Sequence, residues 1–146
     1  MSDRSILVIH GPNLNLLGTR EPQTYGTDTV DDHVARVHAV ASTHGIRVDS
    51  SLSNSESEIV GAVQGARTAY AGLIINAGAF THYSWALHDA LRSFEGAKIE
   101  VHISNSGARE EFRHTSVIAP VVHGTIAGFG GLGYTLAAEA VVSLLG

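Results

Sequence analysis

Short apolar runs of strand length alternate with segments of helical periodicity along almost the whole chain. Strands are predicted at 5–10, 46–52, 72–76, 98–104 and 125–129, and helices between them at about 30–44, 55–70, 82–96 and 133–145. Two segments, Thr29 to Asp32 and Ser55 to Glu58, resemble the capping boxes that begin helices. Such alternation predicts a parallel sheet with helices on both faces. We therefore expect an α/β fold, a flavodoxin-like three-layer sandwich with a five-stranded parallel sheet, forming a single domain over 1–146.

A long connection follows the first predicted strand. From Gly11 to Gly26 the sequence has no periodicity, and prolines and glycines interrupt it repeatedly. Connections of this length inside a compact protein are usually functional, and many act as lids.

Polar side chains suited to acid–base chemistry follow three of the predicted strands. In an open parallel sheet, ligands bind at the carboxyl ends of the strands. The three groups would therefore meet at one rim and form an active site. They comprise His10, Asn13, Arg20 and Tyr25 after the first strand, Asn76, Thr81 and His82 after the third, and Glu100, His102, Ser104, Asn105, Arg109 and Arg113 within and after the fourth.

The fourth strand carries polar residues where a strand covered on both faces should be apolar. Glu100 and His102 point to one side of the strand, and Val101 to the other. A buried structural hydrogen-bond network would explain the pair. With Asn105 and Arg113 nearby, we favour a functional reading in which Glu100 holds the imidazole of His102 in a set tautomer.

Arg20 and Tyr25 form a second pair of interest. A solvated arginine and an aromatic anchor for the loop would be the simplest explanation. A tyrosine acts as a general base only as the phenolate, which needs a nearby positive charge. One guanidinium about 4 Å away, at an effective dielectric near 20, offers on the order of 4 kcal/mol toward that ionised form. Arg20 alone could therefore suffice.

Composition excludes several classes of protein. The net charge is −5 with nine Lys plus Arg residues, so no basic field is available for nucleic acid or an anionic membrane. The chain has no cysteine, which excludes disulfides, thiolate nucleophiles and Cys-based zinc sites. No signal-peptide segment and no run long enough to cross a bilayer is seen, so a cytoplasmic location is expected.

Two other motifs are better explained structurally. The segment Gly128 to Gly133 fits G-x-G-x-x-G, but it comes too late in the chain for a dinucleotide site and predicts a tight strand-to-helix turn. His33, His38 and His44 lie five and six residues apart, not at the i, i+4 spacing of two helical ligands, so no metal site is expected. The first strand end also lacks the acidic cluster of receiver proteins and the phosphate loop of flavodoxins.

Seven segments spread along the sequence together resemble the type II 3-dehydroquinate dehydratases, essentially from end to end. The resemblance implies a flavodoxin-like fold and the cofactor-free dehydration of 3-dehydroquinate to 3-dehydroshikimate, in aromatic biosynthesis or quinate breakdown. It also implies a homo-oligomer, a dodecamer built as four trimers. The stretches that carry it are Gly11-Pro-Asn-Leu-Asn-Leu-Leu-Gly18, Arg20-Glu-Pro22, Tyr25-Gly26, Ile75-Asn76, Thr81-His82, Glu100-Val-His-Ile-Ser-Asn105 and Arg109-Glu-Glu-Phe-Arg113.

The resemblance implies roles for the reacting groups. Tyr25, its phenolate favoured by Arg20 and supported by Arg109, would remove a proton alpha to the substrate ketone. His102, oriented by Glu100, would protonate the departing hydroxyl in an anti elimination through an enolate.

The remaining roles concern binding. Asn13 would position a water that stabilises the enolate. The substrate-binding residues implied by the resemblance are Asn76, His82, Asp89, Ile103, Ser104 and Arg113. Asn76, Ser104 and the backbone N–H of Ile103 would bind the carboxylate. His82 and Arg113 would hold ring hydroxyls, and Asp89 would reach the site of a neighbouring subunit.

The chain departs from the family pattern at a few positions. Ala77 replaces the usual proline, Ser106-Gly107 replaces an aliphatic–histidine pair, and Trp85 and His88 are also unusual. None of these is a reacting group. The alternative to an enzyme is a non-catalytic flavodoxin-like module that binds a small anion, although binding alone needs neither a base nor an acid.

Overall fold

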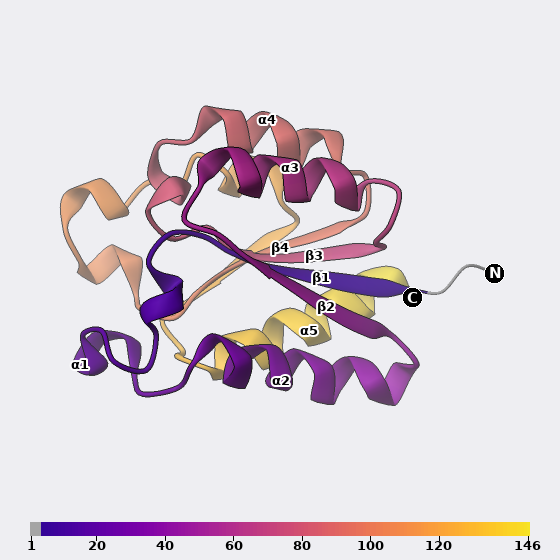
Figure 1. Ribbon diagram of the computed structural model, residues 1–146, viewed down its shortest axis with the longest axis horizontal. Helices are drawn as coiled ribbons and strands as arrows, with labels where there is room; N and C mark the ends of the chain where they lie inside the picture. The colour runs from indigo at the N-terminus through magenta and orange to yellow at the C-terminus, as the bar shows by residue number, and fades with distance from the viewer. Residues whose placement is uncertain (1–3) are drawn as a thin grey trace.

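The computed structural model describes residues 4–146 and contains one sheet of five parallel strands (Figure 1). The strands are β1 (Ser5–His10), β2 (Arg47–Leu52), β3 (Gly72–Asn76), β4 (Ala97–His102) and β5 (Gly124–Ala127). Their order in the sheet is β2-β1-β3-β4-β5, and every neighbouring pair is parallel. This is the flavodoxin-like order, so the predicted fold class is confirmed.

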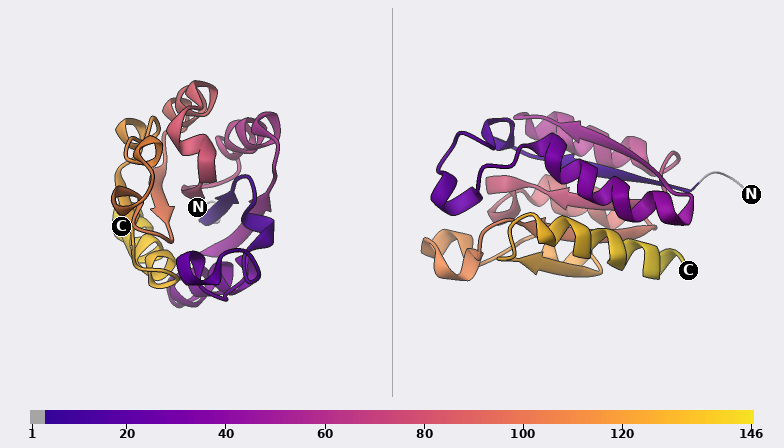
Figure 2. Two further views of the ribbon diagram at one scale, coloured as in Figure 1. Left: turned by 90° about the vertical axis from the view of Figure 1, so that its left-hand side faces the viewer. Right: turned by 90° about the horizontal axis from the view of Figure 1, so that it is seen from below.

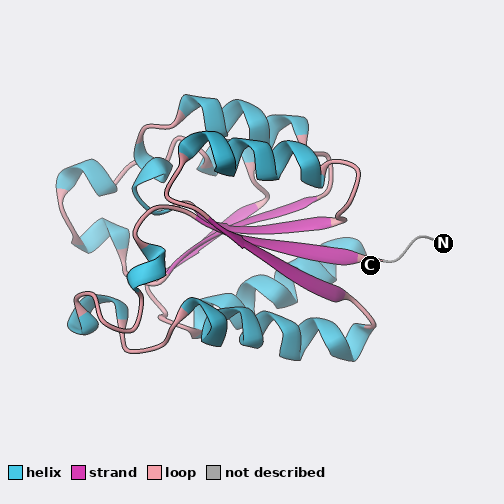
Figure 3. Cartoon of the chain, viewed as in Figure 1, coloured by secondary structure: helices cyan, strands magenta, loops and turns pink. Residues whose placement is uncertain are grey.

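Four longer helices make the two outer layers (Figures 1 and 3). The helices α2 (Val30–Ala41) and α5 (Leu132–Leu145) pack on one face, while α3 (Glu56–Ala66) and α4 (Trp85–Ser93) pack on the other. Alternating residues of β1 divide between the two cores: Ile6 and Val8 pack toward α2 and α5, and Leu7 and Ile9 toward α3 and α4. The views in Figure 2 show these layers along the strands and from below.

Of the two predicted capping boxes, at the N-termini of α2 and α3, only the first is complete in the structure. At α2, Thr29 Oγ1 accepts the Asp32 N–H and the Asp32 carboxylate accepts the Thr29 N–H, which completes a capping box. At α3, Ser55 Oγ accepts the Glu58 N–H, but Glu58 Oε1 accepts a hydrogen bond from Ser53 Oγ at 2.6 Å instead. The second predicted box is therefore only half formed.

Several predicted boundaries were wrong by a few residues. The helix α3 ends at Ala66, since the chain continues toward Tyr70 in tight turns rather than as α-helix. The strands β4 and β5 end at His102 and Ala127, two residues before their predicted ends. The early end of β4 leaves Ile103 and Ser104 outside the sheet.

The connection after β1 contains short helices rather than being wholly irregular. A 3₁₀ turn spans Leu14–Leu16, and the single-turn helix α1 spans Pro22–Tyr25. The predicted turn between β5 and α5 covers residues 128–131, where Gly128 and Gly130 have φ of 96° and 57°, and Gly133 already belongs to α5. No helix within residues 4–146 is long and apolar enough to cross a membrane.

Candidate active site

A pocket lies at the carboxyl ends of β1, β3 and β4. Asn76 and His102 are the last residues of β3 and β4, and the loop after β1 closes the opposite wall. Of the twelve residues to which the resemblance gives a catalytic or substrate-binding role, ten line this one pocket. They are Asn13, Arg20, Tyr25, Asn76, His82, His102, Ile103, Ser104, Arg109 and Arg113.

Tyr25 is held between two guanidinium groups. It is the last residue of α1 and is only 9% exposed. Arg109 Nη1 donates a hydrogen bond to the phenolic oxygen at 2.7 Å and another to Ser104 Oγ at 3.2 Å. Arg20 instead lies over the ring, with Cζ 5.0 Å from the centroid, and its Nε pairs with Glu21. Direct contact with the phenolic oxygen therefore comes from Arg109, where the sequence argument had given Arg20 the larger part.

His102 lines the same pocket as Tyr25 and is backed by Glu100. His102 Nε2 lies 2.5 Å from Glu100 Oε2, and the Glu100 side chain is fully buried. No hydrogen bond joins His102 Nδ1 to another residue within 4–146. Because a carboxylate only accepts, Nε2 carries a proton, and Nδ1 is the nitrogen available to a ligand.

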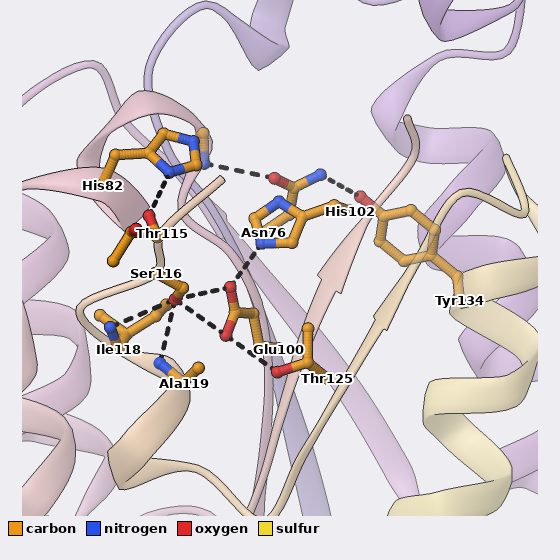
Figure 4. A network of polar contacts seen from close by, with 11 residues as sticks. Asn76, His82, Glu100, His102, Thr115, Ser116, Ile118, Ala119, Thr125 and Tyr134 are labelled. Atoms are coloured by element: carbon orange, nitrogen blue, oxygen red, sulfur yellow. Dashed lines mark hydrogen bonds and ion pairs between the residues drawn. The ribbon is translucent and has the colours of Figure 1, made fainter. Parts of the chain in front are cut away.

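Two hydroxyl groups that sequence reasoning missed complete the shell around Glu100 (Figure 4). Ser116 Oγ donates to the carboxylate at 3.0 Å and accepts the N–H groups of Ile118 and Ala119. Thr125 Oγ1 donates to Glu100 Oε1 at 3.1 Å. Thr125 is the register partner of Glu100 on β5. The sequence signal for Thr125 is a threonine placed opposite a buried glutamate on the neighbouring strand. Using that signal requires knowing the register of β5 beforehand.

Asn76 has both ends of its amide engaged. Its Oδ1 accepts the Gly78 N–H at 3.2 Å, and its Nδ2 donates to the Tyr134 hydroxyl at 3.1 Å. The neighbouring Ala77 is fully buried, with φ of −81°. The turn is therefore fixed by hydrogen bonds even without the proline of the family pattern.

Histidine and arginine side chains line the far wall of the pocket. His82 Nδ1 donates to the Thr115 carbonyl oxygen at 2.8 Å, and burial lowers the pKa of His82 below its usual value. His82 is therefore neutral near pH 7, and its Nε2 can accept a hydrogen bond. Arg113 Nε donates to Glu110 Oε2 at 3.1 Å. Hydrogen bonds, that from Arg113 among them, hold the pKa of Glu110 below its usual range.

Asp89 is not part of this pocket. It lies on the exposed surface of α4, beside Val60 and Arg67 of the α3 region. Nothing within one chain brings it to the other predicted residues. Among the described residues, no three His, Asp or Glu side chains are grouped closely enough to hold a metal ion.

The arrangement can support proton transfer at two points of one bound molecule. A phenol beside two positive charges can ionise, and the resulting phenolate can take a proton. A histidine backed by a carboxylate can give one when its ring is protonated on both nitrogens. Between them, the Asn76 amide and Ser104 can bind an anionic oxygen.

Comparisons with known proteins agree along almost the whole chain. The model of the family "Dehydroquinase class II" matches residues 4–142. A 3-dehydroquinate dehydratase from Hyphomonas neptunium is 50% identical over 143 residues, covering 98% of this chain and 96% of that protein. The crystal structure of a type II dehydroquinase from Butyrivibrio crossotus superposes with a TM-score of 0.92 at 44% identity, covering 97% of this chain and 99% of that one. The corresponding structure from Propionibacterium acnes gives 0.90 at 44% identity, with the same coverage.

Proposed function

Since the chain belongs to the class II dehydroquinase family, and so is a hydro-lyase that dehydrates 3-dehydroquinate, we propose that Tyr25 and His102 carry out this reaction as base and acid. The observation that carries the proposal is that the Tyr25 phenol, bonded by Arg109, shares one pocket with the His102–Glu100 pair. The product is 3-dehydroshikimate.

The first step is removal of the proton alpha to the ketone. Arg109 and Arg20 place positive charge at the oxygen and over the ring of Tyr25, which favours the phenolate. The electron pair of the broken C–H bond moves to the ketone oxygen as an enolate. Asn13 lines the pocket and positions a water that donates to this oxygen.

The second step is loss of the hydroxyl as water. His102 Nδ1 gives its proton to the leaving oxygen as the C–O bond breaks and the enolate returns to a ketone. Glu100 accepts from Nε2 and so stabilises the imidazolium before transfer. The proposed elimination is anti, so the proton and the hydroxyl leave from opposite faces of the ring.

The other pocket residues bind the substrate. Asn76, Ser104 and the Ile103 N–H hold its carboxylate, and His82 and Arg113 hold ring hydroxyls. The Gly18–Tyr25 segment acts as a lid that excludes water from the enolate.

The site is completed between subunits. Asp89 is exposed on α4 in the isolated chain and contributes to the pocket of a neighbouring copy. We propose a dodecamer of four trimers as the working form.

The test is a direct assay. Purified protein is incubated with 3-dehydroquinate, and formation of the conjugated enone is followed by absorbance. We expect turnover in the wild type and a loss of at least about a hundredfold in Tyr25→Phe and in His102→Ala. The matched controls, Tyr70→Phe and His44→Ala, change residues outside the pocket and should keep full activity.

Two results would refute the assignment. One is absence of turnover, and the other is unaltered turnover in both site variants. The alternative, a non-catalytic anion-binding module, would show stabilisation of the fold by the ligand without any enone.

A further inference from the structure

A buried row of hydrogen-bonded side chains, Asn76, Tyr134 and His10, lies next to the pocket, and only Asn76 lines the pocket itself. The Tyr134 hydroxyl accepts from Asn76 Nδ2 at 3.1 Å and lies 2.8 Å from His10 Nε2 (Figure 4 shows the first of these contacts). Tyr134 and His10 are 0% exposed, and Asn76 is 3% exposed. The proposed reaction gives neither Tyr134 nor His10 a role.

The Gly78 backbone fixes the direction of both hydrogen bonds of the Asn76 amide. The Gly78 N–H can only donate, so the oxygen end of the Asn76 amide must face it. The Nδ2 end then faces Tyr134 and donates to its oxygen. In the His10 tautomer that carries its proton on Nδ1, the Tyr134 hydroxyl donates to Nε2, and in the other tautomer Nε2–H donates to the Tyr134 oxygen; in both, His10 contacts this hydroxyl at 2.8 Å.

Burial keeps the His10 and Tyr134 side chains uncharged. It lowers the pKa of His10 to about 3 and raises the pKa of Tyr134, so both groups stay neutral across the physiological range. The His33 ring stacks on Tyr134 with centroids 4.5 Å apart and planes 8° apart, which fixes the phenol from its face. Tyr134 also anchors α5 in the core with α2.

We propose that Tyr134 is a positioning residue for substrate carboxylate recognition, acting through Asn76. An amide group is planar, so fixing Oδ1 on Gly78 and one N–H on Tyr134 also fixes the second N–H. Asn76 lines the pocket, and this second N–H is the one offered to the carboxylate. This role of Tyr134 rests on the proposed function of Asn76 in carboxylate binding, and it explains why the Asn76 amide has its orientation.

The test is Tyr134→Phe, which removes one oxygen and keeps the ring. We expect KM for 3-dehydroquinate to rise about tenfold with kcat within about twofold, because carboxylate binding is shared by ground state and transition state. Tyr70→Phe is the matched control, since its hydroxyl donates to Asp49 at 2.7 Å outside the pocket. It should leave both constants unchanged.

Tyr134→Phe also leaves His10 Nε2 buried without a partner, which can destabilise the fold. The double variant Tyr134→Phe with His10→Leu removes both polar groups and leaves only Asn76 unsupported. The same rise in KM is expected in this background.

A binding experiment separates this inference from the reaction itself. Calorimetric titration with quinate and with its uncharged carboxamide measures carboxylate recognition without turnover. We expect the preference for quinate to shrink about tenfold in both variants. An unchanged preference, or equal weakening of both ligands, would overturn the positioning role, whether or not the wild type makes product. Absence of product in the wild type alone counts against the proposed function and not against Tyr134.

Discussion

At the scale of single residues, the charged groups of the site are hydrogen-bonded to buried partners whose positions are fixed by further hydrogen bonds. Glu100 is the clearest case, with His102, Ser116 and Thr125 all bonded to one carboxylate. A buried carboxylate needs such donors, because removing its hydration is costly. The same donors fix the direction in which Glu100 holds the imidazole.

Thr125 provides a test of this shell. Thr125→Val keeps the shape of the side chain and removes the donor to Glu100, so we expect kcat to fall about tenfold with little change in KM. Thr125→Ser keeps the hydroxyl and should retain most of the activity. Steady-state kinetics on the two variants measure this effect. Equal kcat values in both would show that the Thr125 hydroxyl does not contribute to catalysis.

His10 makes stability depend on pH. Its pKa is about 3 in the fold, lowered by burial, and about 6.5 in an unfolded chain. Between these values the unfolded chain binds the extra proton, so the free energy of unfolding falls as pH drops below 6.5. The expected loss is about 1.4 kcal/mol for each pH unit down to about pH 3.

Urea unfolding at several pH values between 7.5 and 4.5 measures this dependence. His10→Gln should reduce the slope by one proton relative to the wild type. His33 and His82, whose pKa values are also lowered by burial, contribute in the same direction and remain in both proteins. Identical slopes in the two proteins would contradict the assignment to His10.

At the scale of elements, periodicity and turn residues were enough to predict the strand and helix order and the sheet. Ser5–His10 and Gly72–Asn76 were predicted with their observed bounds, because both are continuous apolar runs ending in turn residues. The end of β4 was less accessible, since Ile103 and Ser104 continue the alternating pattern after pairing has stopped. Pairing is a tertiary property that local sequence does not contain.

The candidate site could be predicted in part for the same reason. Residues at strand ends, such as Asn76 and His102, follow from the topology. Ser116 and Thr125 depend on which loop and which strand lie beside Glu100, so no local pattern marked them. The larger contribution of Arg109 at Tyr25 likewise follows from a contact between positions far apart in the chain.

The loops after β1 and β3 touch through a glycine, which leads to a prediction for these two elements. Gly11 N–H donates to the Asn76 carbonyl at 2.8 Å, and a Cβ added at Gly11 would lie 2.4 Å from the Ala77 carbonyl oxygen. Gly11→Ala must push the two loops apart. We expect a destabilisation of about 2 kcal/mol and at least a tenfold loss of turnover.

Chemical unfolding and the enone assay measure both effects. Gly65→Ala on α3 is the matched control, because its added Cβ would meet nothing within 4 Å beyond the adjacent backbone of its own helix. It should stabilise the protein by about 0.5–1 kcal/mol through helix propensity and leave turnover unchanged. Normal activity in Gly11→Ala would mean that the loops can separate without disturbing the site.

At the scale of the whole molecule, one exposed aromatic surface is unexplained within a single chain. Trp85 is 63% exposed and Tyr83 59% exposed at the start of α4. Trp85 and the predicted intersubunit residue Asp89 are four positions apart, so they lie on the same side of this helix. Large exposed aromatics of this kind mark interaction surfaces.

We therefore expect Trp85→Glu to weaken the assembly. Sedimentation of the wild type should show a species many times larger than the 15.3 kDa chain, and the variant should shift toward smaller species with lower activity. Trp85 is the single tryptophan, so its fluorescence emission in the wild type reports burial on assembly. A wild type that sediments as a stable, active monomer would rule out the oligomer.

The hydrogen bond from Arg109 to Tyr25 joins two parts of the chain that are 84 positions apart. It fastens the segment that carries the tyrosine and, by the same contact, supplies positive charge to the phenol. If this segment acts as the proposed lid, its opening would break this hydrogen bond and separate the phenol from the guanidinium. The proposed lid and base would then be coupled, with Tyr25 able to remove a proton only while the pocket is closed to bulk water.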